Sequence, residues 1–401
     1  MKAGWRLATI GEVCDIVNGG TPKTGVATYW GGKHQWITPA EMGKRSTPYV
    51  SKTERTITDQ GMQNSSARPL PPLSVILSSR APIGHLVINT EPMATNQGCK
   101  GLVPGKQIDH KYLYYYLGSI VELLNDLGTG ATFKELSGGK LKAVPVPLPT
   151  LTEQQRIVAL LDEALDGITA AKANAEKNLQ NSRAIFKSQR EVLLSPQQGW
   201  NAAPLADLCD VKHGYAFEGE FFAQEGDYVL LTPGSFFETG GYRERGDKTK
   251  YFVGEIPSNY ILGKNDLLVA MTEQAAGLLG SPLLVPEPDR FLHNQRLGLV
   301  KGKFGVPWLN EFFFHVFNLG RVRQEIHASA SGVKVRHTSP GRIGAVRVEF
   351  PNSIEEQRNI ATQLVDLTEY CERLENIYLQ KLTFLDELRN SLLQRAFSGD
   401  L

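Results

Sequence analysis

The 401-residue sequence has few cysteines and no long apolar run, and each absence excludes a class of protein. Its four cysteines, Cys14, Cys99, Cys209 and Cys371, lie far apart and form no C-x-x-C pair. This spacing favours reduced, buried thiols over a disulfide framework or a zinc site. No apolar segment approaches the roughly 20 residues that cross a bilayer, and the start MKAGWRLATIGE lacks the apolar stretch of an export signal. We therefore expect a cytoplasmic protein without a membrane segment.

Short motifs of nucleotide-dependent and DNA-modifying enzymes are also missing. There is no Asn-Pro-Pro-aromatic motif of adenine methylation and no G-x-G-x-x-G after a strand. Gly138-Gly139-Lys140 is followed by Leu141 rather than by Ser or Thr, which excludes a phosphate loop, and Pro288-Asp289 has no E-x-K downstream to complete a nuclease site. The eight histidines are scattered. We expect no catalytic residue, no metal site and no cofactor.

The formal net charge is only +1, but its distribution is uneven. Residues 1–150 carry 16 Lys and Arg against 10 Asp and Glu, whereas residues 352–401 carry 5 against 9. Within 321–348, six basic residues face the single acid Glu325, which predicts a basic face if these side chains are exposed. The alternative is an ordinary solvated surface.

What the sequence does contain is an internal repeat. At an offset of 202, the residues Glu153, Gln155, Arg156, Val158 and Ala159 recur as Glu355, Gln357, Arg358, Ile360 and Ala361. The match continues upstream to Gly130/Gly332 and Pro149/Pro351 without an insertion, and Trp5, Cys14, Asp15 and Gly19 match Trp200, Cys209, Asp210 and Gly214 at an offset of 195. The chain therefore consists of a globular unit and a long helix, present twice.

Each repeat ends in a helical segment about forty residues long. In the second copy an apolar stripe steps by four and three from Ile360 through Lys381 and Leu388 to Leu392, as in a coiled-coil seam. The stripe from Ile157 to Leu193 is richer in alanine, which suggests that the two helices pack closely on each other. Thr152 and Ser353 are the expected N-caps. The alternative is that each helix packs only on its own globular unit.

Strand and turn signals dominate the globular units, with Ser74–Leu77 and Asp266–Val269 as equivalent strands. Aromatic-rich segments over 111–127 and 308–326 have helical spacing, and their tyrosines fit a core better than a base-stacking surface. We predict an α+β fold with globular domains at 1–150 and 200–351 and long antiparallel helices at 151–199 and 352–401.

Several stretches together resemble the specificity (S) subunit of type I restriction-modification systems. They are Pro147–Ile157 and its echo Pro351–Arg358, Ser79–Gly84, Thr95–Gly98 and Leu392–Gly399. The resemblance covers the whole chain. It implies two target-recognition domains held apart by the paired helices, each reading one half of a bipartite DNA site. It also implies two methylation subunits that bind S-adenosylmethionine and ATP-driven restriction subunits as partners, which would supply the catalysis.

Base reading needs forked donors and acceptors such as Arg, Asn and Gln, whereas Lys, Ser and Thr hold phosphates. We predict DNA contacts from polar residues beside turns, namely Lys23, Thr38, Arg80, Asn96, Gln97, Thr132 and Lys134 in the first unit, and Thr232, Asn294, Gln295, Arg296, Lys334 and Arg336 in the second. For Asn96-Gln97 and Asn294-Gln295, the alternative is that the amides satisfy a turn.

The residues at the two helix starts are interpreted as ledges on which partner subunits dock. They are Glu153, Gln155 and Arg156 in the first copy and Glu355, Gln357 and Arg358 in the second. Because the units share a framework but differ between its conserved segments, we expect two different half-sites. Two alternatives stay open. The chain is a coiled-coil tether with two modules that do not read DNA, or it serves a methylation-only or single-chain restriction system.

Overall fold

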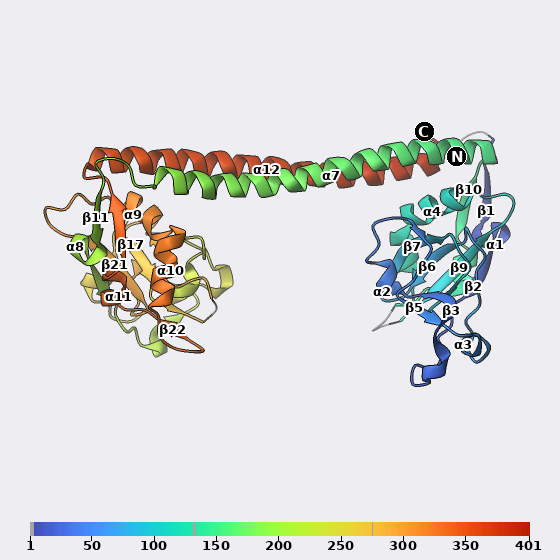
Figure 1. Cartoon of the computed structure of the whole chain (residues 1–401), viewed down its shortest axis with the longest axis horizontal. Helices are drawn as coiled ribbons and strands as arrows, with labels where there is room; N and C mark the ends of the chain where they lie inside the picture. The colour runs from blue at the N-terminus through green and yellow to red at the C-terminus, as the bar shows by residue number, and fades with distance from the viewer. Residues whose placement is uncertain (1–3, 131–133, 275) are drawn as a thin grey trace. The chain divides into compact units, whose positions relative to one another are not determined.

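The computed structural model of the chain describes residues 4–130, 134–274 and 276–401. The chain divides into two compact units. Unit 1 comprises Met1–Lys177 together with Tyr378–Leu401, and unit 2 comprises Asn178–Ile377. Each unit therefore combines one globular body with part of both long helices, α7 and α12 (Figure 1).

The body of unit 1 contains a five-stranded sheet in the order β2-β9-β6-β7-β4, a three-stranded sheet β5-β3-β8 and the pair β1-β10. Its strands are β1 (Arg6–Thr9), β2 (Cys14–Asn18), β3 (Trp30–Ile37), β4 (Tyr49–Val50), β5 (Arg55–Ile57), β6 (Val75–Ser79), β7 (Ile83–Asn89), β8 (Met93–Thr95), β9 (Cys99–Pro104) and β10 (Pro145–Leu148). Its helices are α1 (Ile10–Val13), η1 (Ala27–Tyr29), α2 (Pro39–Met42), α3 (Asp59–Gln63), α4 (His110–Ser119), α5 (Val121–Leu127) and α6 (Gly138–Lys142), followed by α7 (Leu151–Leu193).

Unit 2 has a four-stranded sheet β12-β21-β17-β19, a five-stranded sheet β13-β15-β14-β20-β16 and the pairs β11-β23 and β18-β22. Its strands are β11 (Asn201–Pro204), β12 (Cys209–His213), β13 (Phe222–Ala223), β14 (Tyr228–Leu230), β15 (Tyr251–Phe252), β16 (Ile261–Leu262), β17 (Leu267–Ala270), β18 (Thr272–Glu273), β19 (Pro282–Leu284), β20 (Phe291–Leu292), β21 (Leu297–Gly302), β22 (Arg336–His337) and β23 (Arg347–Phe350). Its helices are α8 (Leu205–Leu208), η2 (Gly219–Phe221), η3 (Pro233–Ser235), η4 (Gly246–Lys248), η5 (Ser258–Tyr260), α9 (Asn310–Phe317), α10 (Gly320–Ala328) and α11 (Pro340–Gly344), followed by α12 (Ile354–Ser398).

One framework recurs in both units. The antiparallel pair β1-β10 of unit 1 corresponds to β11-β23 of unit 2, and β2-β9-β6 corresponds to β12-β21-β17. The predicted strands over Ser74–Leu77 and Asp266–Val269 are confirmed as parts of β6 and β17. The remaining strands differ in number and order. The predicted α+β fold with an internal repeat is thus confirmed, and the repeat is closest in the strands that lead into the long helices.

The aromatic-rich helices of each unit belong to its core. Tyr112 and Tyr116 of α4 are buried and meet Phe397 of α12 edge to face, with ring centroids 5.1 and 5.3 Å apart. Burying a side chain of this size stabilises the fold by roughly 1.5 to 3 kcal/mol. The prediction that these tyrosines pack in a core is confirmed, but each single helix that we expected is interrupted, at Ile120 in unit 1 and near Leu319 in unit 2.

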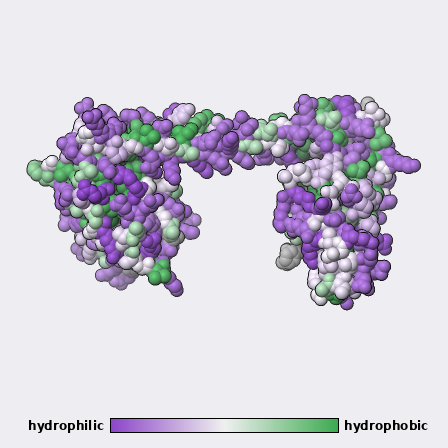
Figure 2. Space-filling view, in the orientation of Figure 1, coloured by the Kyte–Doolittle hydropathy of each residue, from purple (hydrophilic) through white to green (hydrophobic). Residues whose placement is uncertain are grey.

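In each unit, part of α7 packs against part of α12 in antiparallel fashion. In unit 1, Lys172 pairs with Asp386, and in unit 2 the Arg183 Nε lies 2.9 Å from the Glu375 Oε2. Small residues are buried in the α7 stripe, including Ala175 and Ser182, each only 1% exposed. These contacts confirm the paired helices and correspond to the close approach expected from the alanine-rich stripe. On the face shown in Figure 2, hydrophilic residues predominate over the surface of both units.

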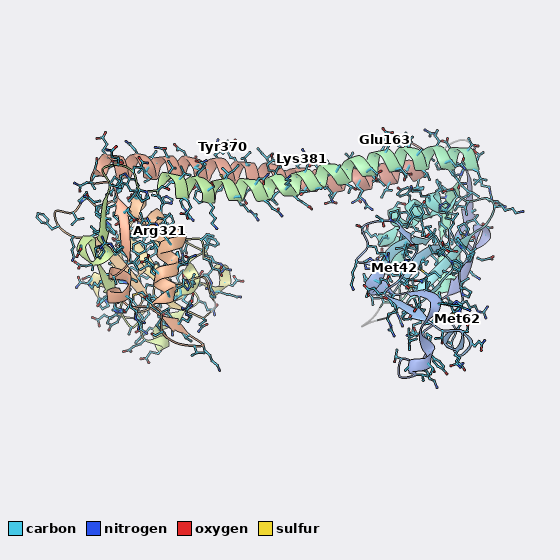
Figure 3. All side chains as sticks on the ribbon, in the orientation of Figure 1. Met42, Met62, Glu163, Arg321, Tyr370 and Lys381 are labelled. Atoms are coloured by element: carbon cyan, nitrogen blue, oxygen red, sulfur yellow. The ribbon has the colours of Figure 1, made fainter. Side chains whose placement is uncertain are left out.

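The predicted seam of α12 is wrong near its C-terminal end. Lys381 (labelled in Figure 3) is exposed and Leu388 is 47% exposed, whereas Leu393, Ala396 and Phe397 are buried. The reason is that this end of α12 packs against the α4 tyrosines as well as α7, so its buried face does not follow a two-helix seam.

The structure also corrects the alignment of the two helix starts. The Gln154 Nε2 donates to the Pro149 and Gln107 carbonyls, and its Oε1 accepts from the Asp109 amide. Gln357 makes the same three bonds, to the Pro351 and Pro307 carbonyls and from the Leu309 amide. Gln154, not Gln155, is therefore the equivalent of Gln357. The second copy has one additional residue between its strand and its helix, where we had expected no insertion.

This insertion also changes the N-cap of the first helix. The Thr150 hydroxyl accepts from the Glu153 amide at 3.4 Å, just as the Ser353 hydroxyl accepts from the Glu356 amide at 3.3 Å. The prediction of Ser353 is confirmed. Thr152 lies inside α7, so the cap predicted there is wrong, because the helix begins at Leu151.

Candidate nucleic-acid interface

In unit 1, two loops that carry predicted DNA contacts are fixed side by side. The turn after β8 is an Asx turn, in which the Asn96 Oδ1 accepts from the Gly98 amide at 2.8 Å and the Cys99 amide donates to the Asn96 carbonyl. The Asn96 Nδ2 also donates to the Thr21 hydroxyl at 2.9 Å, which ties this turn to the loop after β2. Asn96 is thus occupied within the fold, as the turn interpretation had proposed, while the side chain of Gln97 is exposed.

Two tryptophan indoles donate hydrogen bonds to backbone carbonyls of the loop after β2. The Trp36 indole donates to the Gly20 carbonyl at 2.9 Å, and the Trp30 indole donates to the Lys23 carbonyl at 3.3 Å. The Lys23 side chain is exposed, so its backbone is fixed while its ammonium group faces solvent. Arg55, which we did not predict, is exposed and its guanidinium carbon lies 3.7 Å from the Trp30 ring centroid. Such stacking holds an arginine in one orientation while leaving its donors available.

Unit 2 builds the same turn after β20. The Asn294 Oδ1 accepts from the Arg296 amide at 3.0 Å, and the Leu297 amide donates to the Asn294 carbonyl. Asn294 is buried, whereas Gln295 and Arg296 are exposed. The turn interpretation therefore describes both asparagines, and the glutamine next to each asparagine is exposed.

A glycine on the neighbouring loop makes both turns possible. A Cβ atom at Gly19 would stand 1.9 Å from the Asn96 carbonyl oxygen, and one at Gly214 would stand 2.2 Å from the Asn294 carbonyl oxygen. No side chain fits at these distances. The paired glycines of the repeat thus have a physical role, which is to let the two loops touch.

A second loop in each unit closes by a pair of backbone hydrogen bonds. Thr129 and Glu135 exchange N–H···O bonds of 3.0 and 2.9 Å in unit 1, and Ser331 and His337 do so at 3.0 and 2.8 Å in unit 2. Lys134 and Lys334 are exposed on these loops, and Lys134 is equivalent in register to Arg336. The predicted contact Thr132 lies outside the described residues.

Predicted arginines in both units are engaged within the fold. The Arg80 NH1 lies 3.7 Å from the Glu135 Oε2, and the Arg336 NH1 lies 3.6 Å from the buried Glu273 Oε1. Arg336 also donates to the His327 carbonyl. Both arginines are about one-third exposed. Each is tied to an acid and keeps only part of its donors for a ligand.

The basic face predicted over 321–348 is reduced for the same reason. Arg321 pairs with Glu349, Arg342 donates to the Ser331 hydroxyl, and Arg323 donates to the Leu279 carbonyl. Burial lowers the pKa of Arg323 to about 10. Figure 3 shows Arg321 on α10, within the body of unit 2. Lys334, Arg342 and Arg347 are exposed, whereas Arg321, Arg323 and Arg336 are half-buried, so the count of basic residues overstated the surface charge of this segment.

The two predicted threonines act as helix caps. The Thr38 hydroxyl accepts from the Glu41 amide at 3.2 Å at the start of α2, and Thr232 forms a capping box with Ser235 at the start of η3. Both are half-buried. Their hydroxyl oxygens are used locally, which leaves at most the hydroxyl proton for a phosphate.

At the helix starts, the predicted docking residues divide into exposed and buried positions. Gln155, Arg156, Glu355 and Arg358 are exposed, and Glu153 is half-buried and pairs with Arg156, with the Arg156 Nε 2.7 Å from its Oε2. Gln357 is fully buried with its three hydrogen bonds. It cannot form part of a docking surface, and its assignment to that surface was wrong because the alignment placed it opposite the exposed Gln155.

No chemistry of metals or reactive thiols stands out in the part of the chain that the structure describes. No group of three or more His, Cys, Asp or Glu there could hold a metal ion. The thiols of Cys14, Cys99 and Cys209 are buried and free, and burial raises the pKa of each to about 12. No helix over the described ranges is long and apolar enough to cross a membrane.

Comparison with known proteins decides the family. The profile of the family described as Type I restriction modification DNA specificity domain matches residues 2–180 and 197–383. The chain belongs to this family. Each matched range covers most of one copy of the repeat, so each unit of this specificity protein carries one copy of the family's domain.

Individual relatives agree with the family. The chain is 32% identical over 227 residues to the type I restriction enzyme MjaIX specificity subunit of Methanocaldococcus jannaschii, an alignment that covers 52% of each protein. The chain thus spans about half the length of the first curated relatives that it matches.

Solved structures extend the similarity to the whole chain. A chain from a structure on complex assembly and conformational transition of the type I R-M system matches with a TM-score of 0.78 at 15% identity, over 100% of this chain and 99% of that one. The HsdS subunit from Thermoanaerobacter tengcongensis matches with a TM-score of 0.66 at 15% identity, over 100% and 98%. At this identity these matches show the fold.

Proposed function

We propose that this chain is the DNA sequence-specificity subunit of a type I restriction-modification complex. Each unit reads one half of a bipartite, asymmetric DNA site, and the paired helices set the unread gap. One observation carries the proposal. Each unit has an exposed glutamine, Gln97 or Gln295, on an equivalent Asx turn that touches an equivalent glycine. The neighbouring side chains differ between the two units. One frame with different side chains reads two different sequences.

The exposed residues on these turns have the chemistry that base reading requires. A glutamine amide can donate to and accept from the major-groove edge of adenine, and an arginine can bind guanine with two hydrogen bonds. Gln97 and Gln295 are the candidates for the first contact, and Arg296 is the candidate for the second. Lys23, Lys134 and Lys334 are exposed cations suited to phosphates. Arg80 and Arg336 are secondary candidates, because each is tied to an acid.

The long helices have the dimensions of a spacer. At a rise of about 1.5 Å per residue, the 43 residues of α7 and the 45 of α12 each span roughly 65 Å. Exposed residues at the two helix starts, with Gln155 and Arg156 on α7 and Glu355 and Arg358 on α12, are the proposed docking ledges. The helix start itself is present twice in the same frame, which suits two copies of one partner, and of the ledge residues Gln155 and Arg358 occupy equivalent positions. We assign that place to two methylation subunits, which bind S-adenosylmethionine, and restriction subunits would join for cleavage. Catalysis then lies in these partners.

The proposal is tested by mapping modified adenines across the host genome with this gene intact and with it deleted. We expect one bipartite, asymmetric motif to lose its methylation on deletion. If no motif changes although the partner subunits are expressed, the proposal is wrong. Salt dependence separates the alternative. A DNA reader loses affinity for DNA steeply as the salt concentration rises, whereas a tether that does not read DNA would show no such salt-dependent DNA binding.

A further inference from the structure

A tyrosine in unit 2 occupies a position that is closed in unit 1. The Tyr215 amide donates to the His293 carbonyl at 2.9 Å, and the Gly20 amide donates to the Thr95 carbonyl at the same distance. Tyr215 and Gly20 therefore have equivalent places, each directly after the glycine that touches the Asx turn. In unit 1 no side chain fits there, because a Cβ atom at Gly20 would stand 2.2 Å from the Ala67 amide nitrogen. In unit 2 the place holds a tyrosine, and this residue is 39% exposed.

The backbone of Tyr215 lies next to that of the proposed reading residue Gln295. The Gln295 amide donates to the Tyr215 carbonyl at 3.0 Å, so the two residues are joined through the backbone on adjacent loops. Tyr215 also forms a parallel bridge with Asn294, the asparagine of the turn. The position of the tyrosine is thus fixed relative to the glutamine by the same hydrogen bonds that build the loop pair.

Other aromatic rings hold the tyrosine in place. Its ring centroid lies 5.1 Å from that of the buried Phe217, edge to face, and 5.2 Å from that of Tyr260. The Lys212 ammonium lies 4.9 Å from the Tyr260 ring centroid, and Lys212 and Arg296 are both exposed. Tyr215 is therefore an exposed ring supported by aromatic neighbours, with the Lys212 ammonium beside the cluster, and this combination suits a ligand with flat apolar edges and negative charge. Base-paired DNA has both properties.

We infer that Tyr215 contacts a base pair of the half-site read by unit 2 and determines part of its specificity, an inference that rests on the proposed function. The ring supplies apolar contact, as with the methyl group of thymine, and the hydroxyl supplies one hydrogen bond. Unit 1 has no counterpart, because Gly20 leaves that place to the backbone of Ser66 and Ala67. The two half-sites are then read by different sets of chemical groups.

The test uses the full chain assembled with its methylation subunits and duplexes that carry every single base-pair substitution across both half-sites. We expect Tyr215→Ala to weaken binding of the intact site about tenfold and to abolish discrimination at one position, or two adjacent positions, of one half-site only, because one base contact is commonly worth a factor of roughly 5 to 150. Tyr215→Phe keeps the ring and should retain discrimination with a smaller loss.

Phe304 provides the matched control. It is fully exposed in the same unit and follows β21 at Gly302, which pairs with Cys209 at the far end of β12 from Tyr215. Phe304→Ala should change neither affinity nor discrimination by more than about twofold. Unfolding curves of all variants detect any loss of structure, and Tyr215→Leu retains apolar volume if the alanine variant is unstable.

Three results would overturn the inference. The first is unchanged discrimination in Tyr215→Ala, and the second is a uniform loss across both half-sites, which indicates a packing role. The third is a weaker salt dependence without any change in base preference, which indicates a phosphate contact. If the unaltered complex itself shows no sequence preference, the proposed function fails, and that outcome is distinct from these three.

Discussion

The two units agree where the sheet passes into the long helix and differ beside the Asx turn. At the helix start, Gln154 and Gln357 make the same three hydrogen bonds, although the sequence between strand and helix differs by one residue. Beside the turn, the same backbone bond belongs to a covered glycine in unit 1 and to an exposed tyrosine in unit 2. The comparison teaches that buried polar side chains with several hydrogen bonds preserve the shared backbone, while the positions beside the Asx turn are free to differ.

The largest effect is expected when one of the two buried glutamines, Gln154 or Gln357, is replaced. Gln154→Ala and Gln357→Ala each leave an amide and two carbonyls without their partner, and unsatisfied buried groups cost about 1 to 3 kcal/mol apiece. We expect each variant to lose about 4 kcal/mol of unfolding free energy in its own unit, measured by hydrogen exchange resolved by peptide. Gln155→Ala is the control, since this exposed residue should change stability by less than about 0.5 kcal/mol. Equal losses in Gln155→Ala and Gln154→Ala would contradict the corrected alignment.

A second difference between the units appears on acidification. Among the described residues the buried histidines are His293 and His315, both in unit 2, and burial lowers the pKa of each to about 4. Because the folded pKa lies below the unfolded one, the stabilisation is present above about pH 6.5 and is lost as pH falls toward 4. Between pH 7 and pH 5 we expect unit 2 to lose about 4 kcal/mol through the pair, since each histidine loses about 1.4 kcal/mol per pH unit below about 6.5.

The measurement is hydrogen exchange of both units at pH 7 and pH 5, corrected for the intrinsic exchange rate. Replacing His293 and His315 by Gln should remove most of the pH dependence of unit 2 and leave unit 1 as it was. A fall of the same size in both units would point to carboxylates rather than to these imidazoles.

The glycines test whether both reading loops depend on close contact. Gly19→Ala and Gly214→Ala place a Cβ atom against a carbonyl oxygen, and forcing atoms into a packed site costs about 2 kcal/mol. Each variant should weaken binding through its own half-site and leave discrimination at the other intact, as measured with substituted duplexes. Gly139→Ala and Gly341→Ala lie at equivalent places in α6 and α11 with nothing within 4 Å, so they should be neutral or slightly stabilising. Loss at both half-sites from one glycine variant would contradict independent reading.

The smallest effect is expected where the helices pair in solvent. Lys172 with Asp386 in unit 1 and Arg183 with Glu375 in unit 2 are ion pairs in which one partner is exposed and the other half-buried, and such surface pairs contribute about 0.5 kcal/mol or less. Double-mutant cycles on both pairs should give similar small coupling energies that disappear in high salt. A coupling above about 2 kcal/mol in either pair would show that charge rather than packing holds that part of the helix pair together.

The sequence predicted the features that depend on periodicity and repetition. The long helices, the core tyrosines Tyr112 and Tyr116 and the strands β6 and β17 were all predicted, because apolar spacing reports burial directly. The extra residue before α12 was missed, since Glu-Gln-Gln-Arg matches Glu-Glu-Gln-Arg at three of four positions when no residue is inserted. The hydrogen bonds of Gln154 and Gln357 and the caps at Thr150 and Ser353 reveal the insertion.

The candidate site was predicted less completely, because residue type does not reveal which polar groups the fold consumes. Asn96 and Thr38 have suitable chemistry, yet their side chains complete a turn and a helix cap. Tyr215 and Arg55 were missed because their exposure depends on segments far away in the sequence. A comparison of repeat positions, Gly20 against Tyr215, is the one signal in the sequence that could have identified the tyrosine.

The extra residue before α12 decides where the two halves of this protein can be cut and exchanged. A chimera joined by matching the letters Glu153 to Glu355 would enter its helix one residue out of phase, which is a rotation of about 100° and a shift of about 1.5 Å. The buried face of the grafted helix would then turn toward solvent. A junction placed after Gln154 or Gln357 keeps the helix in phase. These two glutamines are therefore the equivalent positions at which reading domains can be exchanged.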